Sequence, residues 1–390
     1  MKAVILAAGE GQRLRPFTAS KPKVMIKVGN RPIVEYVVEA LKKAGILDIV
    51  MVVGYRKDRV MDHFGNGNKF GVEIDYVFQK QQLGTAHALK QAEKAVEGDF
   101  LVVPGDNIID ENTVKSALSI KNSIVYRIVE NVTKYGVLRV GGDGRVVEIL
   151  EKPAEEVSYL ANTGVYRIDT SVFEYIESEN DLTAVINSMI KEGVIFTAVE
   201  SDGVWLDVVH PWDIPRVNEL ALDFRGKVIA GKIEDGVSIV GDVIIGEGSI
   251  IRGGTYIRGP VAVGENCEIG PNAVIGPGVS IGNNTKIEPF SVIENSVIGD
   301  NVRMGSGSRI DGSVIDSGTR IMPGFTVVKG EASIEDSGSV LRIDAGAFIG
   351  ERCKIGANVT AMPGAIIGNE VEIHPLRVVS GRIPDNSRVL

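Results

Sequence analysis

The feature that most constrains this chain is a six-residue repeat in its second half. An aliphatic residue recurs at every sixth position, often followed by glycine. The series comprises Ile233, Ile239, Ile245, Ile251, Ile257, Val263, Ile269, Ile275, Ile281, Ile287 and Ile293. A period of six fits neither an α-helix nor a simple alternating strand. It predicts a parallel β-helix in which hexapeptides build each coil and each coil stacks on the next.

The repeat continues almost to the end of the sequence, with two steps shortened by one residue. It lapses between Lys329 and Asp344 and resumes at Ile349. We expect an inserted loop at the lapse. Left-handed β-helices of this type commonly form trimers, so we expect a homotrimer or a higher homo-oligomer built through this half.

The first half shows a different pattern. Apolar runs of strand length alternate with stretches whose apolar residues have helical spacing, which predicts an α/β, Rossmann-like domain with a mostly parallel sheet. The expected strands are Ala3–Ala8, Ile49–Val53, Val72–Phe78 and Phe100–Val103. The expected helices are Arg31–Ala44, Arg56–Phe64 and Gly84–Ala95, with a linking helix within His210–Gly226 that includes Phe224. We therefore expect a first domain over residues 1–226 and a left-handed β-helix over residues 227–390.

Composition excludes several classes of protein. Apolar residues make up 44% of the 390 residues, which is typical of a folded chain. The net charge is −9 and no run of basic residues occurs, so we expect no nucleic-acid partner. No stretch of eighteen apolar residues occurs, so we expect no membrane association. The two cysteines have no metal-binding spacing and favour a reducing compartment, so we expect a cytoplasmic protein.

The loop after the first expected strand reads LAAGEGQRLRPFTASKPKVM from Leu6 to Met25. Ligands of parallel α/β sheets bind at the carboxyl ends of the strands, and this loop occupies that position. Gly9 and Gly11 would allow backbone N–H groups to approach phosphate oxygens, and Arg13 and Lys23 would neutralise their charge. The spacing matches neither a P-loop nor a complete dinucleotide fingerprint.

This pattern, L-x-x-G-x-G-x-R-L-x-P-x-T followed by P-K, resembles the signature of sugar-1-phosphate nucleotidylyltransferases. The similarity covers about the first 220 residues. It implies that Arg13 and Lys23 are catalytic residues that act on the phosphates of a nucleoside triphosphate. It also implies that the start of the loop binds this substrate, through Leu6, Ala8, Gly9 and Gly11.

Three further stretches agree with this family. Phe78–Leu89, FQKQQLGTAHAL, is similar to its base-recognition segment, which implies a role in reading a pyrimidine for Gln79, Gln82, Gly84 and Thr85. Asp106 in PGDN and Asp207 in WLD resemble its metal-binding aspartates. The resemblance implies that these two aspartates are catalytic and bind Mg²⁺, which prefers carboxylate and phosphate oxygens.

Three short motifs, YGV, EKP and NTG, resemble the family's sugar-binding segments. The resemblance implies that Gly136 makes room for the sugar, that Glu151 and Asn162 bind its hydroxyls, and that Lys152 binds its phosphate. The expected partners are therefore a nucleoside triphosphate and a sugar-1-phosphate, with glucose-1-phosphate and dTTP or UTP as the leading pair.

Other functions remain open at this point. One is a bifunctional N-acetylglucosamine-1-phosphate uridylyltransferase that also acetylates glucosamine-1-phosphate, and a mannose-1-phosphate guanylyltransferase is a third member of the same class. From another class, the chain could be a non-catalytic nucleotide-sugar sensor. No histidine occurs between Val228 and Ile373, and acetyl transfer to an amine needs a base. We therefore expect the β-helix to serve assembly, with acetyl transfer absent or vestigial.

Overall fold

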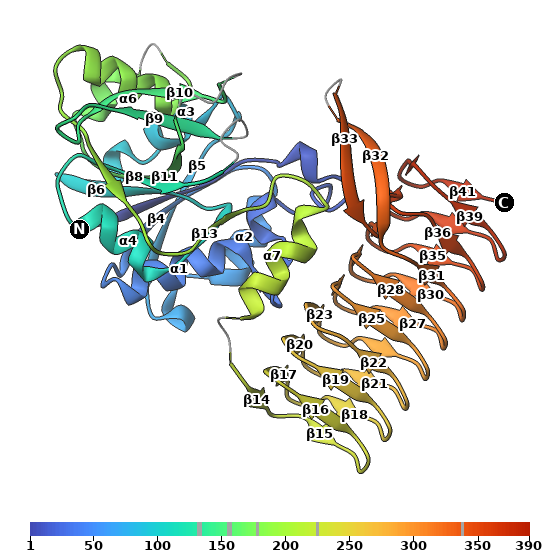
Figure 1. Cartoon of the computed structure of the whole chain (residues 1–390). Helices are drawn as coiled ribbons and strands as arrows, with labels where there is room; N and C mark the ends of the chain where they lie inside the picture. The colour runs from blue at the N-terminus through green and yellow to red at the C-terminus, as the bar shows by residue number, and fades with distance from the viewer. Residues whose placement is uncertain (131–134, 154–157, 177–178, 224–225, 337–338) are drawn as a thin grey trace. The chain divides into compact units, whose positions relative to one another are not determined.

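The computed structural model describes residues 1–130, 135–153, 158–176, 179–223, 226–336 and 339–390 (Figure 1). The chain forms two compact units whose boundary is not a single point in the sequence. Unit 1 contains Met1–Gly11, Ser20–Ile26 and Pro32–Asp207. Unit 2 contains Gln12–Ala19, Lys27–Arg31 and Val208–Leu390. Two short N-terminal segments therefore belong to the same unit as the hexapeptide repeat.

Unit 1 is built on one mixed sheet with the strand order β10-β9-β11-β6-β1-β4-β5. Its parallel part contains β1 (Ala3–Ala7), β4 (Asp48–Val53), β5 (Glu73–Phe78) and β6 (Asp99–Pro104), as the apolar runs predict. Beyond β6 the neighbours are antiparallel: β11 (Leu160–Asp169), β9 (Gly136–Val140) and β10 (Val146–Glu151). Strand β8 (Ser123–Ile128) pairs with β11 and with β12 (Thr197–Glu200).

Helices cover both faces of this sheet. The helices of unit 1 are α1 (Ile33–Lys43), α2 (Lys57–Phe64), α3 (Thr85–Lys90), α4 (Glu111–Leu118), α5 (Val172–Tyr175) and α6 (Leu182–Lys191). Along β1, Ile5 packs in one core with α1 and α4, whereas Val4 packs in the other with α3 and α6. Because the central strands are buried on both faces, their sequences read as continuous apolar runs. Helix α3 is shorter than expected, and a 3₁₀ turn, η4 (Glu93–Ala95), follows it.

The hexapeptide half of unit 2 is a left-handed β-helix with three parallel sheets, in which each strand pairs with its counterpart one coil later (Figure 1). The first sheet contains β14 (Val228–Ile229), β17 (Val243–Ile245), β20 (Val261–Val263), β23 (Val279–Ile281), β26 (Val297–Ile298), β29 (Val314–Ile315), β34 (Phe348–Ile349), β37 (Ile366–Ile367) and β40 (Arg382–Ile383). The second contains β15 (Lys232–Ile233), β18 (Ile250–Ile251), β21 (Glu268–Ile269), β24 (Lys286–Ile287), β27 (Arg303–Met304), β30 (Arg320–Ile321), β35 (Lys354–Ile355), β38 (Glu372–Ile373) and β41 (Arg388–Val389). The third contains β16 (Ser238–Val240), β19 (Tyr256–Arg258), β22 (Val274–Ile275), β25 (Val292–Glu294), β28 (Arg309–Asp311), β31 (Thr326–Val327), β36 (Thr360–Ala361) and β39 (Val378–Val379).

The aliphatic residues of the repeat point into the β-helix and form one continuous core, in which Ile245, Ile251, Ile257 and Ile269 are fully buried. The lapse in the repeat is an antiparallel hairpin of β32 (Gly330–Asp336) and β33 (Ser339–Ala345), so the expected insertion is present. Helix α7 (Asp213–Leu222) is the expected linking helix, although Phe224 lies outside the described residues. No helix in the described part of the chain is long and apolar enough to cross a membrane.

Candidate active site

Two short strands bring Asp106 and Asp207 together in unit 1. Asp106 lies in the turn between β6 and β7 (Asn107–Ile109), and β7 pairs antiparallel with β13 (Trp205–Asp207). The register places Asp207 opposite Asn107, directly beside Asp106. The Gly105 N–H donates to the Leu6 carbonyl of β1 at 2.9 Å, and a Cβ at this position would lie 3.0 Å from the same oxygen, so glycine allows this close approach. Asp106 and Asp207 are far apart in the sequence, and the pairing of β7 with β13 brings their carboxylates close together.

The ammonium group of Lys23 lies between the two carboxylates. Its Nζ is 2.7 Å from Asp106 Oδ2 and 3.1 Å from Asp207 Oδ1. Burial by itself would lower the pKa of Lys23, but the charges and hydrogen bonds of the two aspartates outweigh it and raise the pKa above its ordinary value. Lys23 is therefore protonated at neutral pH. One ammonium group between two carboxylates leaves a net negative charge at this point.

The residues expected to read the base gather at the ends of β4 and β5. Gln79 follows β5 and is buried, and its side-chain Nε2 donates to the Gly84 carbonyl at 3.1 Å. Nε2 also lies 3.0 Å from His87 Nδ1. The hydroxyl of Thr85 accepts a hydrogen bond from the Leu182 N–H at 2.9 Å, so it joins the start of α3 to the start of α6. The contacts with Gly84 and His87 hold the Gln79 amide in place.

Sequence reasoning did not identify Gly54, which lies at the centre of this region. A Cβ at this position would lie 2.9 Å from the Gln79 carbonyl oxygen and from Gln82 Nε2, and 3.0 Å from Ala8 Cβ. Gly54 directly follows the buried strand β4, at the ligand-binding edge of the parallel sheet. A glycine at that edge is the signal that could have revealed it.

The expected sugar-binding residues meet on the antiparallel part of the sheet. Gly136 and Glu151 are register partners in β9 and β10, and Asn162 lies on the neighbouring strand β11. A Cβ on Gly136 would lie 2.9 Å from Glu151 Oε2 and 3.9 Å from Asn162 Cβ. Burial raises the pKa of Glu151, and the nearby Lys152 offsets this only in part. The structure therefore brings Gly136, Glu151 and Asn162 together.

Hydrogen bonds to Tyr166 and Gly164 hold the Asn162 side chain of this group in place. Asn162 Nδ2 donates to the Tyr166 hydroxyl at 2.6 Å, and Asn162 Oδ1 accepts from the Gly164 N–H at 3.0 Å. Tyr166 is buried and was not identified from the sequence. Lys152 has a φ of 42°, and its Nζ lies 3.7 Å from Glu151 Oε1. Its backbone N–H donates to the carbonyl of Tyr135, whose ring packs edge-on against Trp205 of β13.

The opening loop is divided between the units. Ala8, Gly9 and Gly11 follow β1 in unit 1, and a Cβ on Gly9 would meet no atom within 4 Å. Lys23 begins a 3₁₀ turn, η2 (Lys23–Met25), in the same unit. Arg13 is exposed and belongs to unit 2, in the 3₁₀ turn η1 (Gln12–Leu14).

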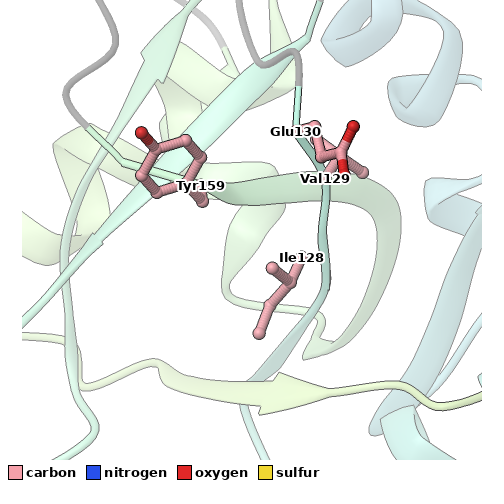
Figure 2. Close-up of a pocket in the computed structure, with 4 residues that line it drawn as sticks. All are labelled: Ile128, Val129, Glu130 and Tyr159. Atoms are coloured by element: carbon pink, nitrogen blue, oxygen red, sulfur yellow. The ribbon is translucent and has the colours of Figure 1, made fainter.

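A solvent-open hollow of about 570 Å³ lies elsewhere in unit 1, where β8 ends and β11 begins. Figure 2 shows its lining residues, Ile128, Val129, Glu130 and Tyr159. None of these four is among the expected site residues, and none is close in sequence to Lys23, Asp106 or Asp207. The candidate active site consists of Lys23 with its two aspartates and the base and sugar groups described above.

Comparisons with known proteins identify families that match both parts of the chain. Residues 2–223 match the family described as nucleotidyl transferase. Residues 257–338 match the GMPPB C-terminal domain, and residues 346–374 match the hexapeptide repeat of succinyl-transferase.

Some curated relatives align with nearly the whole length of this chain. The bifunctional protein GlmU of Methanococcus maripaludis is 36% identical over 387 residues, covering 95% of this chain and 92% of that protein. A bifunctional sugar-1-phosphate nucleotidylyltransferase/acetyltransferase of Sulfurisphaera tokodaii is 34% identical, covering 97% of each chain. The crystal structure of a putative glucose-1-phosphate thymidylyltransferase from Bacillus anthracis has a TM-score of 0.53 and 32% identity, covering 60% of this chain and 98% of that one. The chain therefore belongs to the sugar-1-phosphate nucleotidylyltransferase family.

Proposed function

We propose that this protein transfers a nucleotidyl group from a nucleoside triphosphate to a sugar-1-phosphate and releases pyrophosphate. The observation that carries the proposal is the position of the Lys23 ammonium between the carboxylates of Asp106 and Asp207. Glucose-1-phosphate with dTTP or UTP is the leading substrate pair, supported by the likeness to the Bacillus anthracis protein. Uracil and thymine differ by one methyl group, which supports only about 1–3 kcal/mol of discrimination, so we expect both bases to be used.

Asp106 and Asp207 would hold a Mg²⁺ ion. The donor set fits this ion, because Mg²⁺ takes oxygen ligands and commonly binds one or two carboxylates together with substrate phosphates. In the structure a cation, the Lys23 ammonium, already bridges the two carboxylates. No group of three or more possible metal-ligating side chains occurs among the described residues. Phosphate oxygens would therefore complete the coordination, and the ion would neutralise charge on the triphosphate.

The reaction needs no covalent enzyme intermediate and no general base. The phosphate of the sugar substrate is already ionised at neutral pH, so one of its oxygens can form a bond to the α-phosphorus. The bond from that phosphorus to the oxygen of the leaving pyrophosphate breaks in line. We propose that Lys23 and Arg13 stabilise the charge that develops on the phosphate oxygens, while Gln79, Gly136, Glu151 and Asn162 orient the two substrates.

A pyrophosphate-release assay tests the proposal directly. The full-length protein is incubated with Mg²⁺ and each pair from a grid of five triphosphates and several sugar-1-phosphates, including glucose-1-phosphate and N-acetylglucosamine-1-phosphate. We expect turnover with dTTP or UTP that depends on the sugar phosphate. Absence of turnover across the whole grid would instead favour a non-catalytic sensor.

Replacing Gly136 with alanine is expected to raise the KM for the sugar-1-phosphate about tenfold. The added methyl group would displace the Glu151 carboxylate, whose hydrogen bonds to sugar hydroxyls would be lost. Gly142→Ala is the matched control, because a Cβ there meets no atom within 4 Å and the position is exposed. Steady-state kinetics with each substrate varied in turn would measure the KM values of both variants. An unchanged sugar-phosphate KM in Gly136→Ala would contradict the assignment of this group.

Acetyl transfer is a second candidate function, and the name of the Sulfurisphaera tokodaii relative favours it. Residues 227–390 contain one histidine, His374, which follows β38, and Asp344 pairs with Lys329 at 3.1 Å. We expect acetyl-CoA and glucosamine-1-phosphate to release no free thiol above background with the full-length protein. Enzyme-dependent thiol release would establish a bifunctional enzyme.

We also propose that the β-helix assembles into a homotrimer. Its third sheet exposes two apolar side chains at paired positions on neighbouring strands, with Val274 37% and Tyr256 38% exposed. Apolar groups on an exposed sheet face are typical of an interaction surface. Analytical ultracentrifugation would measure the oligomeric state.

A further inference from the structure

The segments on both sides of the Lys23 segment belong to the β-helix unit. Gln12–Ala19 precedes Ser20–Ile26, and Lys27–Arg31 follows it. Lys23 itself lies in unit 1, but the chain that leads to it and away from it is held in unit 2. The contacts of the two flanks are therefore contacts within the β-helix unit.

One edge of the β-helix carries a column of short polar side chains. We call this set the corner column. In it, a side-chain oxygen accepts a hydrogen bond from the backbone N–H of a residue one coil earlier. Without this bond, the N–H group would lack a partner at the turn. The donors are the N–H groups of Glu265, Asn283, Asp300, Glu351 and Asn369, at 2.7–3.1 Å. The corner column consists of Asn283, Asp300, Ser317, Asn369 and Asp385.

Asn369 uses the remaining half of its amide to hold the segment before Lys23. Its Oδ1 accepts from the Glu351 N–H at 2.7 Å, while its Nδ2 donates to the Pro16 carbonyl at 3.1 Å. The Nδ2 also lies 3.3 Å from Asp385 Oδ1, so the amide has acceptors on its nitrogen side and a donor on its oxygen side. A flipped amide would place like atoms together at both ends. The side chain is therefore fixed in the orientation that reaches Pro16.

The segment Gln12–Ala19 also has buried side chains, as expected for a segment that is anchored in the β-helix unit. Leu14, Phe17 and Thr18 are buried, with exposures of 1%, 2% and 0%. The neighbouring Arg13 is exposed. The Pro16 carbonyl also accepts from the Ala19 N–H at 3.3 Å and so closes the turn after it. Burial and the Asn369 hydrogen bond thus fix the backbone that presents Arg13.

Asp300 holds the segment after Lys23 in the same way. Its Oδ1 accepts the Asn283 N–H as part of the corner column, and its Oδ2 accepts a hydrogen bond from Lys27 Nζ at 2.6 Å. The buried Asn218 of α7 accepts from the Gly29 N–H at 2.8 Å and donates to the Gly278 carbonyl at 2.9 Å. Asn30 donates from Nδ2 to the Ile281 carbonyl at 2.8 Å. Charged and neutral hydrogen bonds therefore fix this flank on the β-helix as well.

We propose that Asn369 and Asp300 are positioning residues for nucleotidyl transfer, and that the β-helix orders the phosphate-binding loop through them. The inference rests on the proposed function, because it assigns Arg13 and Lys23 to the phosphates. It adds a role for the β-helix besides assembly. If both flanks were loose, part of the population would lack a competent loop, and the apparent affinity for the triphosphate would fall by that fraction.

The test uses substitutions that keep the corner column intact. In Asn369→Ser a hydroxyl can still cap the Glu351 N–H, as Ser317 does for Asp300, but it cannot reach Pro16. In Asp300→Asn the Oδ1 cap remains and the charge facing Lys27 is removed. The matched control is Asn283→Ser, because Asn283 caps the Glu265 N–H and, in the described part of the chain, forms no hydrogen bond with residues 12–19 or 27–31.

Two measurements on the full-length protein separate the outcomes. In the Asn369→Ser/Asp300→Asn double variant, we expect faster amide hydrogen exchange in a peptide covering residues 12–19, and a fall in kcat/KM for the triphosphate of about tenfold or more. The KM for the sugar-1-phosphate should change by less than about twofold, and Asn283→Ser should match the wild type in all three quantities.

Exchange and kinetics equal to those of the control would overturn the proposal, and so would faster exchange with unchanged kinetics. If the wild type itself shows no turnover, the proposed function fails. The exchange experiment would then still decide whether the two residues order the loop.

Discussion

Replacing Asp106 or Asp207 with asparagine is expected to lower kcat by roughly 10²–10³-fold. Each substitution removes one of the two carboxylates that lie beside Lys23 and would hold Mg²⁺. Asparagine keeps the size of the side chain and one oxygen, so the antiparallel pairing of β7 with β13 should persist. We also expect the Mg²⁺ concentration for half-maximal activity to rise, because a neutral amide binds this ion more weakly than a carboxylate.

Asp75→Asn provides the control for this experiment. Asp75 lies on β5 in the same unit, its side chain is 66% exposed, and its nearest cation is Lys2 at 3.9 Å. Turnover is measured by pyrophosphate release across a Mg²⁺ titration, with circular dichroism to check folding. Near-normal kcat in either site variant at saturating Mg²⁺ would show that the two aspartates are not the metal site.

The repeating part of the fold could be read almost completely from the sequence. A period of six has one common structural solution, and each inward residue, such as Ile269, falls at its expected place in the core. The parallel strands of unit 1 were predicted for a similar reason, since burial on both faces leaves an uninterrupted apolar run such as Ala3–Ala7. Both signals are local and periodic.

The antiparallel half of the sheet and the division of the opening loop could not be predicted. Strand β11 pairs with β6, β8 and β9, and nothing in its local sequence specifies these partners. Leu14 and Phe17 read as part of a phosphate loop, yet they are buried within the β-helix unit. The Asn369 contact with Pro16 joins residues 353 positions apart, a separation that no periodic signal covers. These features depend on contacts between residues far apart in the sequence, which local sequence patterns do not predict.

The candidate site could be predicted from the sequence only in part. Lys23, Asp106 and Asp207 were predicted from motifs, and the structure places the Lys23 ammonium within hydrogen-bond distance of each carboxylate. Gly54 and Tyr166 were missed because their roles depend on neighbours from other strands: Gly54 faces Ala8 and Gln82, and Tyr166 accepts from Asn162. The catalytic and metal-binding roles of Lys23, Asp106 and Asp207 remain predictions.

Replacing Lys23 with methionine is expected to lower kcat by roughly 10²–10³-fold, because the ammonium group that stabilises developing charge on the phosphates is lost. Methionine retains a side chain of similar length, so packing changes little. Because the pKa of Lys23 is raised, its contribution to stability is complete below its ordinary pKa and is lost only as the pH rises through the higher folded value. No loss of activity from Lys23 deprotonation is therefore expected between about pH 6 and pH 9 in the wild type.

Thermal unfolding distinguishes a catalytic Lys23 from a purely structural one. Without the ammonium, the neighbouring carboxylates of Asp106 and Asp207 repel each other, so Lys23→Met should unfold at a lower temperature in chelator. Mg²⁺ should restore much of this loss, because the ion neutralises the same carboxylates, while kcat stays low. The control Lys43→Met removes an exposed lysine of α1 that pairs with Glu39, and it should alter neither quantity. If Mg²⁺ restores both the unfolding temperature and kcat, Lys23 only balances the charge of the two aspartates and takes no part in the transfer.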